Sequence, residues 1–182
     1  MIELKFPLED REILKTLKAG DSVLLSGVIY TGRDAAHKKL VEKIDKGEEL
    51  PVEIKDIAIY YTGPCPKHEN KPIGSCGPTT SGRMDAYAPK LLDLGQAVMI
   101  GKGERNDEVI SACKRNKAVY FAAAGGAGAL LANSVKKCEV IAFPELLSEA
   151  IHRLEVEKMP LIVAIDTEGR DLFKTGRDKY KK

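Results

Sequence analysis

Arginine, aspartate and histidine lie together at the start of one expected helix. The segment TGRDAAHKKL (residues 31–40) follows an apolar run that ends at Tyr30, and it contains Arg33, Asp34 and His37. The carboxyl end of a strand is where open α/β sheets bind ligands. An arginine there adds a permanently charged, planar fork to free backbone N–H groups, which suits a carboxylate or a phosphate. The same residues also fit a helix cap with a surface ion pair, and His37 fits a buried structural histidine.

A second segment, IGSCGPTTSGRMDAY (residues 73–87), precedes another expected helix. Its glycines allow close approach of the backbone to a ligand, its hydroxyl groups can donate or accept hydrogen bonds, and its arginine adds a second fixed cation. It is not a Walker loop, because the GxxxxGK[ST] spacing is absent. It predicts either a site for a small anion or a rigid turn with capping hydroxyls. The residues concerned are Gly74, Ser75, Gly77, Thr79, Thr80, Ser81, Gly82 and Arg83.

A third candidate is Lys102, which lies between two glycines in MIGKG (residues 99–103), directly after an expected strand. A solvated lysine in a turn is the simpler alternative. Together with Arg33 and Arg83, Lys102 gives three cations beside hydroxyl groups and glycine-rich backbone, without an aromatic platform for a base or an evident metal cluster. This inventory favours a dicarboxylate as the ligand.

A glycine-rich junction, AAAGGAGALLA (residues 122–132), superficially resembles a dinucleotide-binding turn. Its glycines follow the pattern GGxG rather than GxGxxG, so we expect close packing of a helix on the sheet instead.

Length and charge restrict the class of protein. The chain has 182 residues, of which 43% are apolar, and 29 basic and 27 acidic side chains give a net charge of +2. Residues 1–182 are expected to form one domain, with a short, solvated basic tail from about residue 174. Elsewhere basic and acidic residues are interspersed, which argues against a nucleic-acid partner. The basic residues of the tail are Arg177, Lys179, Lys181 and Lys182.

Neither a secretory signal nor a membrane span is expected. The N-terminal residues MIELKFPLEDRE are charged from the third position, and the uncharged stretch between Lys117 and Lys136 is too short in its apolar part to cross a bilayer. We therefore expect a cytoplasmic protein. The four cysteines lack the close paired spacing of zinc or iron–sulfur motifs and are expected to be reduced thiols. They are Cys65, Cys76, Cys113 and Cys138.

Alternating strand-like and helix-like segments predict an α/β domain, with parallel pairing where a helix joins consecutive strands. We expect strands at Ile2–Phe6, Val23–Tyr30, Ile54–Tyr61, Ala97–Ile100, Ala118–Ala123, Val140–Phe143 and Leu161–Ile165. We expect helices at Leu8–Leu17, Ala36–Ile44, Met84–Leu94, Asp107–Asn116, Gly126–Lys136 and Pro144–Leu154. The long loop Thr62–Gly82, rich in proline and glycine, is expected to be functional.

Four motifs in one order resemble a known family. YTGRDAAHKKL and GPTTSGRMDAY, followed by MIGKG and YFAAAGGAGALLANSVKK, are similar to the β subunit of iron–sulfur-dependent fumarate and tartrate hydro-lyases. The same unit forms the C-terminal domain of single-chain class I fumarases. The resemblance spans residues from about Gly20 to Phe173 and implies a swivelling β/β/α three-layer fold.

The resemblance also implies a shared active site. A partner α subunit would hold a [4Fe–4S] cluster through its own cysteines, so this chain would bind no metal. Arg33, Arg83 and Lys102 would hold the substrate carboxylates, and Thr79 would be the catalytic base. Supporting roles fall to Asp34, His37 and Thr80, the first two mainly in orienting Arg33 and the start of its helix.

From this resemblance we expect the substrate to be fumarate, which would be hydrated to (S)-malate. The alternative substrate is L-tartrate, which would be dehydrated to oxaloacetate. A dicarboxylate-binding module without catalysis is a further alternative, against which the retained Thr79 argues. A site shared between subunits also predicts an exposed apolar surface and a dimer of heterodimers.

Overall fold

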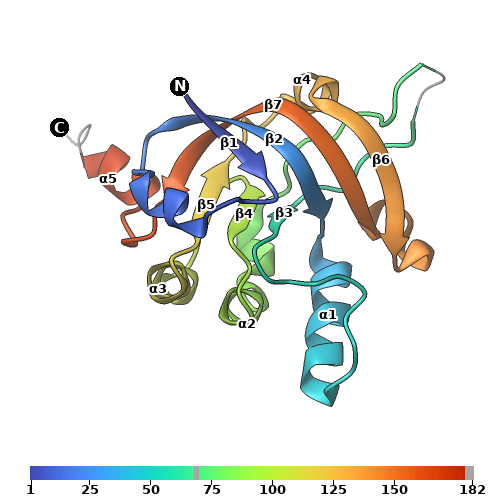
Figure 1. Ribbon diagram of the computed structural model, residues 1–182, viewed down its shortest axis with the longest axis horizontal. Coiled ribbons are helices and arrows are strands. Elements are labelled where there is room, and N and C mark those ends of the chain that lie inside the picture. The colour runs from blue at the N-terminus through green and yellow to red at the C-terminus, as the bar shows by residue number, and fades with distance from the viewer. Residues whose placement is uncertain (68–69, 179–182) are drawn as a thin grey trace.

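The computed structural model describes residues 1–67 and 70–178, where seven strands form one mixed sheet in the order β1-β2-β3-β4-β5-β7-β6 (Figure 1). The strands are β1 (Ile2–Phe6), β2 (Ser22–Thr31), β3 (Ala58–Tyr60), β4 (Val98–Gly101), β5 (Val119–Ala122), β6 (Val135–Ala142) and β7 (Ile151–Ile165). Parallel pairing runs from β1 through β5, and β7 is antiparallel to β2, β5 and β6. This mixed α/β architecture confirms the predicted class, and the more specific swivelling three-layer arrangement stays a prediction.

Strand β2 closes the sheet on itself. It pairs with β1 and β3 as a parallel neighbour and with β7 as an antiparallel one, so the path β2-β3-β4-β5-β7 returns to β2. Figure 1 shows β2 and β7 as long, curved strands that lie side by side. The pairing of β2 with β7 shifts register between Leu25 and Gly27. Gly27 has a φ of +105°, and a Cβ there would lie 1.8 Å from the carbonyl oxygen of Phe6, so this bend requires glycine.

Helices α1, α2 and α3 lie below the sheet in Figure 1, whereas α4 lies above it. The helices are α1 (Asp34–Lys46), α2 (Ala88–Asp93), α3 (Asp107–Asn116), α4 (Gly128–Asn133) and α5 (Leu172–Asp178), with 3-10 helices at Arg11–Thr16, Ser81–Met84 and Pro144–Glu149. Both faces of β3 and β4 are buried. Ile59 and Met99 pack in a cluster with side chains of α1–α3, and Tyr60 and Ile100 pack in a second cluster with β1, β2 and β7. The central strands are therefore a rigid support for the loops at their ends.

The predicted helix Pro144–Leu154 is wrong. A 3-10 helix occupies Pro144–Glu149, and β7 begins at Ile151. Leu154 is fully buried and pairs with Ile29 of β2 on one side and Cys138 of β6 on the other. The strands that stabilise this segment, β2 and β6, lie far from it in the sequence. The predicted strand Leu161–Ile165 is only the last part of this long strand.

Other predicted boundaries also change. The predicted helix Gly126–Lys136 ends at Asn133, because β6 starts at Val135, well before the predicted strand Val140–Phe143. The predicted strand Ile54–Tyr61 and helix Met84–Leu94 both shorten, to β3 and α2. Only one 3-10 helix forms within the predicted helix Leu8–Leu17.

The remaining strands and helices agree with prediction within a few residues. The α3 boundaries are identical to those expected, and its cap is local, since the Asn106 side chain accepts a hydrogen bond of 2.9 Å from the Val109 N–H. Helix α1 extends two residues beyond the expected end, to Lys46, and is capped by Gly47, whose φ is +68°. Helix α5 occupies the start of the predicted basic tail, and the side chains of that tail singled out above lie outside the described residues.

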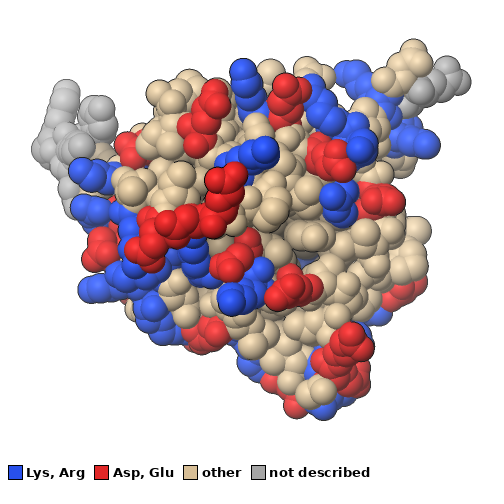
Figure 2. All heavy atoms as spheres, in the orientation of Figure 1, with Lys and Arg blue, Asp and Glu red and all other residues tan. Residues whose placement is uncertain are grey.

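Three predictions from composition can be compared with the structure. All four cysteines are free thiols, as expected. In the described part of the chain, no helix has the length and apolar character needed to cross a membrane. Basic and acidic side chains are intermingled on the face shown in Figure 2, with no broad surface of one sign.

Candidate functional site

The candidate residues meet at one edge of the sheet, where the parallel strands β2, β3 and β4 end. Arg33 follows β2, and Lys102 directly follows β4. The segment that holds Thr79 returns to this edge because its N–H donates to the carbonyl of Tyr61 at 2.7 Å. The Ser81 N–H then donates to the Lys102 carbonyl at 2.9 Å. The structure therefore brings together the two segments and the lysine that the sequence analysis singled out separately.

Asp34 joins the two arginines. Its Oδ1 accepts a hydrogen bond of 2.8 Å from Nε of Arg83, and its Oδ2 lies 3.9 Å from Nε of Arg33. Within the described residues, no hydrogen bond or ion pair involves the two terminal nitrogens of Arg83, whose side chain is 53% exposed. These nitrogens are free to form a forked pair with a carboxylate.

Glu149 caps helix α1 and was missed by the sequence analysis. Its Oε2 accepts a hydrogen bond of 3.1 Å from the Ala35 N–H, and its Oε1 lies 3.4 Å from Nη2 of Arg33. The helix N-terminus that was expected to receive an anion thus holds a carboxylate of the chain itself. No local signal pointed to Glu149, because it lies 114 residues from Ala35, in a segment predicted to be helical.

His37 is fully buried and holds the backbone of Arg33. Its Nδ1 lies 2.9 Å from the Arg33 carbonyl oxygen, and its ring contacts Tyr61 edge-on at a centroid distance of 5.1 Å. Burial is the main cause that lowers the pKa of His37 from 6.5 to about 4. The ring is therefore neutral at neutral pH, and a proton on Nδ1 donates to the carbonyl. This geometry agrees with a supporting role for His37.

Ser81 links the glycine-rich loop to β4 and β5. Its buried Oγ accepts hydrogen bonds from the Lys102 N–H at 3.0 Å and from the Tyr120 hydroxyl at 2.9 Å. A Cβ on Gly101 would lie 1.9 Å from this Oγ, so glycine is needed at the end of β4. The sequence analysis named Ser81 as one hydroxyl among several and Gly101 only as a glycine beside Lys102, and Tyr120 carried no signal.

Thr79 and Lys102 expose their reactive groups at this edge. Thr79 is half-buried, and within the described residues its hydroxyl has no hydrogen bond. Thr80 is exposed and forms an isolated parallel bridge with Lys102. No ion pair holds the half-buried Lys102 in the same part of the chain, and its Cδ lies 3.7 Å from the position of a Cβ on Gly125. A hydroxyl and an ammonium group are thus both available to a ligand.

A buried ion pair between Arg105 and Asp85 lies next to the turn that carries Arg83. Arg105 is wholly buried in its side chain, and its Nε donates to Oδ1 of Asp85 at 2.6 Å. Its guanidinium lies between the rings of Tyr61 and Tyr120, 5.4 and 5.0 Å from their centroids. The other Asp85 oxygen accepts from the Asn106 N–H at 2.8 Å. Asp85 directly follows the turn that presents Arg83, so this pair fixes the turn, a role that the sequence analysis also missed.

Burial makes two of the four cysteines poor ligands for an iron–sulfur cluster. Burial raises the pKa of Cys76 and of Cys113 to about 12, which disfavours the thiolate that binds iron. Among the described residues, no three His, Cys, Asp or Glu side chains are grouped closely enough to hold a metal ion.

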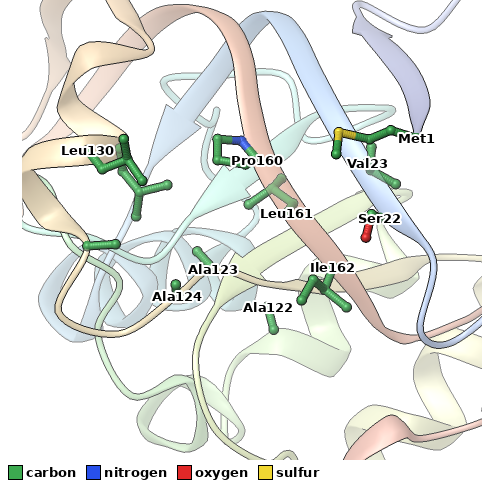
Figure 3. Close-up of a pocket in the computed structure, with 12 residues that line it drawn as sticks. Met1, Ser22, Val23, Ala122, Ala123, Ala124, Leu130, Pro160, Leu161 and Ile162 are labelled. Carbon is green, nitrogen blue, oxygen red and sulfur yellow. The ribbon is translucent and has the colours of Figure 1, made fainter.

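An apolar cavity has a volume of about 370 Å³, and Figure 3 shows residues that line it. Its lining includes Ala123 and Ala124, which adjoin Gly125, and the exposed side chains of Leu130 and Ile162. It contains none of the three candidate cations. The exposed apolar surface expected of a site shared between subunits stays a prediction.

Comparisons with known proteins agree on one family. A family model described as fumarase C-terminus matches residues 1–176. Class I fumarate hydratases of Salmonella typhimurium (aerobic) and Escherichia coli (anaerobic) are 42% and 43% identical over 177 residues, which cover 94% of this chain and 30% and 32% of theirs. A Methanocaldococcus jannaschii protein named putative L(+)-tartrate dehydratase subunit beta is 38% identical over 188 residues, covering 100% of this chain and 96% of its own. The chain thus spans about a third of the fumarate hydratases that it matches.

Proposed function

Because the chain belongs to the fumarase C-terminus family, we propose that it is the β subunit of a hydro-lyase that reversibly hydrates fumarate to (S)-malate. One observation carries this proposal. Arg33, Arg83, Lys102 and the Thr79 hydroxyl come to one edge of the sheet, although they lie on three separate segments. Three cations can hold two carboxylates, and a hydroxyl beside them can move a proton.

The chemistry needs fixed positive charge. Removal of a proton from the carbon next to a carboxylate places extra negative charge on that carboxylate in the transition state. Asp34 holds Nε of Arg83, and Ser81 holds the backbone of Lys102, so both cations lie near this charge before the substrate arrives and can stabilise it.

Thr79 is the proposed base. An alcohol is weakly basic, so the deprotonated hydroxyl must be stabilised by its surroundings. Thr79 lies in the same segment as Arg83, and its neighbour Thr80 bridges to Lys102. Positive charge from these two cations would lower the free energy of a negative oxygen at this position.

The rest of the site would come from a partner. We propose that an α subunit holds the [4Fe–4S] cluster, in keeping with the burial of Cys76 and Cys113, and that the complex is a dimer of heterodimers in the cytoplasm. The cluster, when bound, would act as a Lewis acid toward the hydroxyl group that leaves or arrives. The name of the Methanocaldococcus jannaschii relative, a subunit beta, supports such a partner.

L-Tartrate is the second candidate substrate. The relative named as a tartrate dehydratase subunit aligns over nearly its whole length, whereas the fumarate hydratases are somewhat more similar in sequence. Tartrate carries one more hydroxyl than malate, and a single added hydroxyl is discriminated by few contacts. A dicarboxylate-binding module without catalysis remains a third alternative, which would bind malate tightly without a partner.

The test is anaerobic hydration of fumarate by this chain alone and after co-expression with a cluster-bearing α subunit. Activity in the pair only, lost by at least roughly 100-fold in Thr79→Ala, is expected for a proton-transfer residue. Dehydration of L-tartrate by the same complex, compared by kcat/KM, then decides between the two substrates. A stable complex with a full cluster and no activity on either would contradict the proposal.

A further inference from the structure

Glu149 connects two elements that are far apart in the sequence. Its carboxylate bridges the first turn of α1, through the Ala35 N–H at 3.1 Å, and the guanidinium of Arg33, through Nη2 at 3.4 Å. The side chains of Arg33 and Glu149 are 22% and 25% exposed, so neither is freely solvated. Ion pairs of this half-buried kind restrict a side chain more than pairs on the open surface.

A bend in the backbone at Leu147 directs the chain so that Glu149 reaches Arg33. Leu147 has a φ of +54° and a ψ of −115°, a conformation that residues with a Cβ rarely adopt. The turn places the Ser148 carbonyl oxygen 3.2 Å from the position of a Cβ on Gly63, and Nη1 of Arg33 lies 2.8 Å from that same position. Arg33 is therefore enclosed by Gly63 on one side and Glu149 on another.

Charges alternate along the edge of the site. The order Glu149, Arg33, Asp34, Arg83 places each arginine beside a carboxylate, with Asp34 holding Nε of Arg83 at 2.8 Å. Nε of Arg33 is buried and makes no hydrogen bond within the described part of the chain, so Asp34 alone does not fix this guanidinium. Glu149 supplies the closest ion-pair contact of Arg33.

We propose that Glu149 is a positioning residue, which orients Arg33 toward a substrate carboxylate. This inference rests on the proposed dicarboxylate site. Without the negative charge of Glu149, Arg33 keeps its own charge but samples several directions, so substrate binding must also order the side chain. The KM for the dicarboxylate then rises, whereas the proton transfer at Thr79 changes less.

The variant Glu149→Gln removes the charge and keeps the size of the side chain and an oxygen for the Ala35 N–H. Glu149→Asp keeps the charge on a shorter side chain and is expected to rescue part of the effect. The matched control is Glu145→Gln. Glu145 pairs with Lys39 and so joins the same 3-10 helix to α1, but this pair is more exposed and does not contact Arg33.

Two measurements test the proposal. In the assembled enzyme, Glu149→Gln is expected to raise KM roughly tenfold with a change in kcat below about threefold, while Glu145→Gln keeps both. In the full chain alone, the NMR cross-peak of the buried Arg33 Nε–H, assigned by its loss in Arg33→Lys, should broaden or shift in Glu149→Gln and stay unchanged in Glu145→Gln.

The outcomes separate this inference from the proposed function. An unchanged or lower KM in Glu149→Gln, or an unchanged Arg33 cross-peak in both Glu149 variants, would overturn the positioning role. If the wild-type complex converts neither dicarboxylate, the proposed function fails, and the NMR comparison still decides whether Glu149 orders Arg33.

Discussion

Asp34 accepts a hydrogen bond of 2.8 Å from Nε of Arg83, which lies 49 residues later in the sequence. The contact joins the first turn of α1 to the 3-10 helix at Ser81–Met84. It uses one nitrogen of the guanidinium and leaves the two terminal nitrogens for a ligand.

Because Nε of Arg83 holds Asp34 and its terminal nitrogens stay free for a ligand, we predict that lysine cannot replace Arg83. In Arg83→Lys, a single ammonium group cannot hold Asp34 and also form a forked pair with a carboxylate. We expect kcat/KM of the assembled enzyme to fall about 100-fold, and the midpoint of thermal unfolding to change by less than a few degrees, because the pair is half exposed. A kcat/KM within threefold of wild type would exclude Arg83 from substrate contact.

Lys102 is predicted to bind the substrate by its charge alone. Lys102→Met keeps the length of the side chain and removes the ammonium group, for which the described residues provide no ion pair. We expect the KM for the dicarboxylate to rise at least roughly tenfold, with stability near that of wild type. Lys38→Met, at a position that is 66% exposed on α1, is the control and should change neither value. Equal KM values for the two variants would argue against substrate contact.

Gly101 is predicted to be required by Ser81. In Gly101→Ala, the new Cβ would lie 1.9 Å from Ser81 Oγ and 3.0 Å from Cδ2 of Tyr61. We expect the free energy of unfolding to fall by about 1–3 kcal/mol, as for other overpacked positions. Adding Ser81→Ala removes the atom nearest to the new Cβ. The double variant should therefore lose less free energy of unfolding than the two single variants lose together. Strict additivity in urea denaturation would show that the clash is relieved elsewhere.

The buried pair of Arg105 and Asp85 is predicted to matter for stability. Asp85→Asn leaves the guanidinium of Arg105, whose side chain is 0% exposed, without its counter-charge. The expected loss is about 3–5 kcal/mol in chemical denaturation. The control is Asp93→Asn, which breaks the ion pair between Asp93 and Arg115. The side chains of Arg115 and Asp93 are 46% and 48% exposed, so this variant should lose less than about 1 kcal/mol of stability. Similar losses in the two variants would contradict the special role of the buried pair.

His37 is predicted to make stability depend on pH below neutrality. Its pKa is about 4 in the folded chain, chiefly because it is buried, against 6.5 for the unfolded residue. The unfolded chain therefore binds this proton first as the pH falls, so the contribution of His37 is complete above pH 6.5 and is lost toward pH 4. The loss amounts to roughly 3 kcal/mol. We expect His37→Gln to lose less stability than wild type between pH 7 and pH 4 in urea denaturation. Titration of the His37 ring near pH 6.5 by NMR would contradict this.

Local sequence determined the elements whose signals are local. A run of apolar residues predicted β2, and the helical spacing of apolar residues predicted α1 and α3 within a few residues. The arginine motifs and Lys102 were also identified as candidates from the sequence, because they follow expected strands, although each also fitted a purely structural role. Their common location followed from parallel strands, whose carboxyl ends lie at one edge.

Tertiary structure decided everything that depends on partners distant in the chain. Strand β7 was partly predicted as a helix, because its stability comes from pairing with β2 and β6 rather than from its own pattern. Glu149 reaches Arg33, and Arg105 reaches Asp85, only after the sheet has closed and the loops have packed on it. The sequence by itself determined which chemical groups are present and in which local elements they lie. Only the folded chain decides which charge faces which, because the energy of an ion pair depends on distance and burial, and long-range packing sets both.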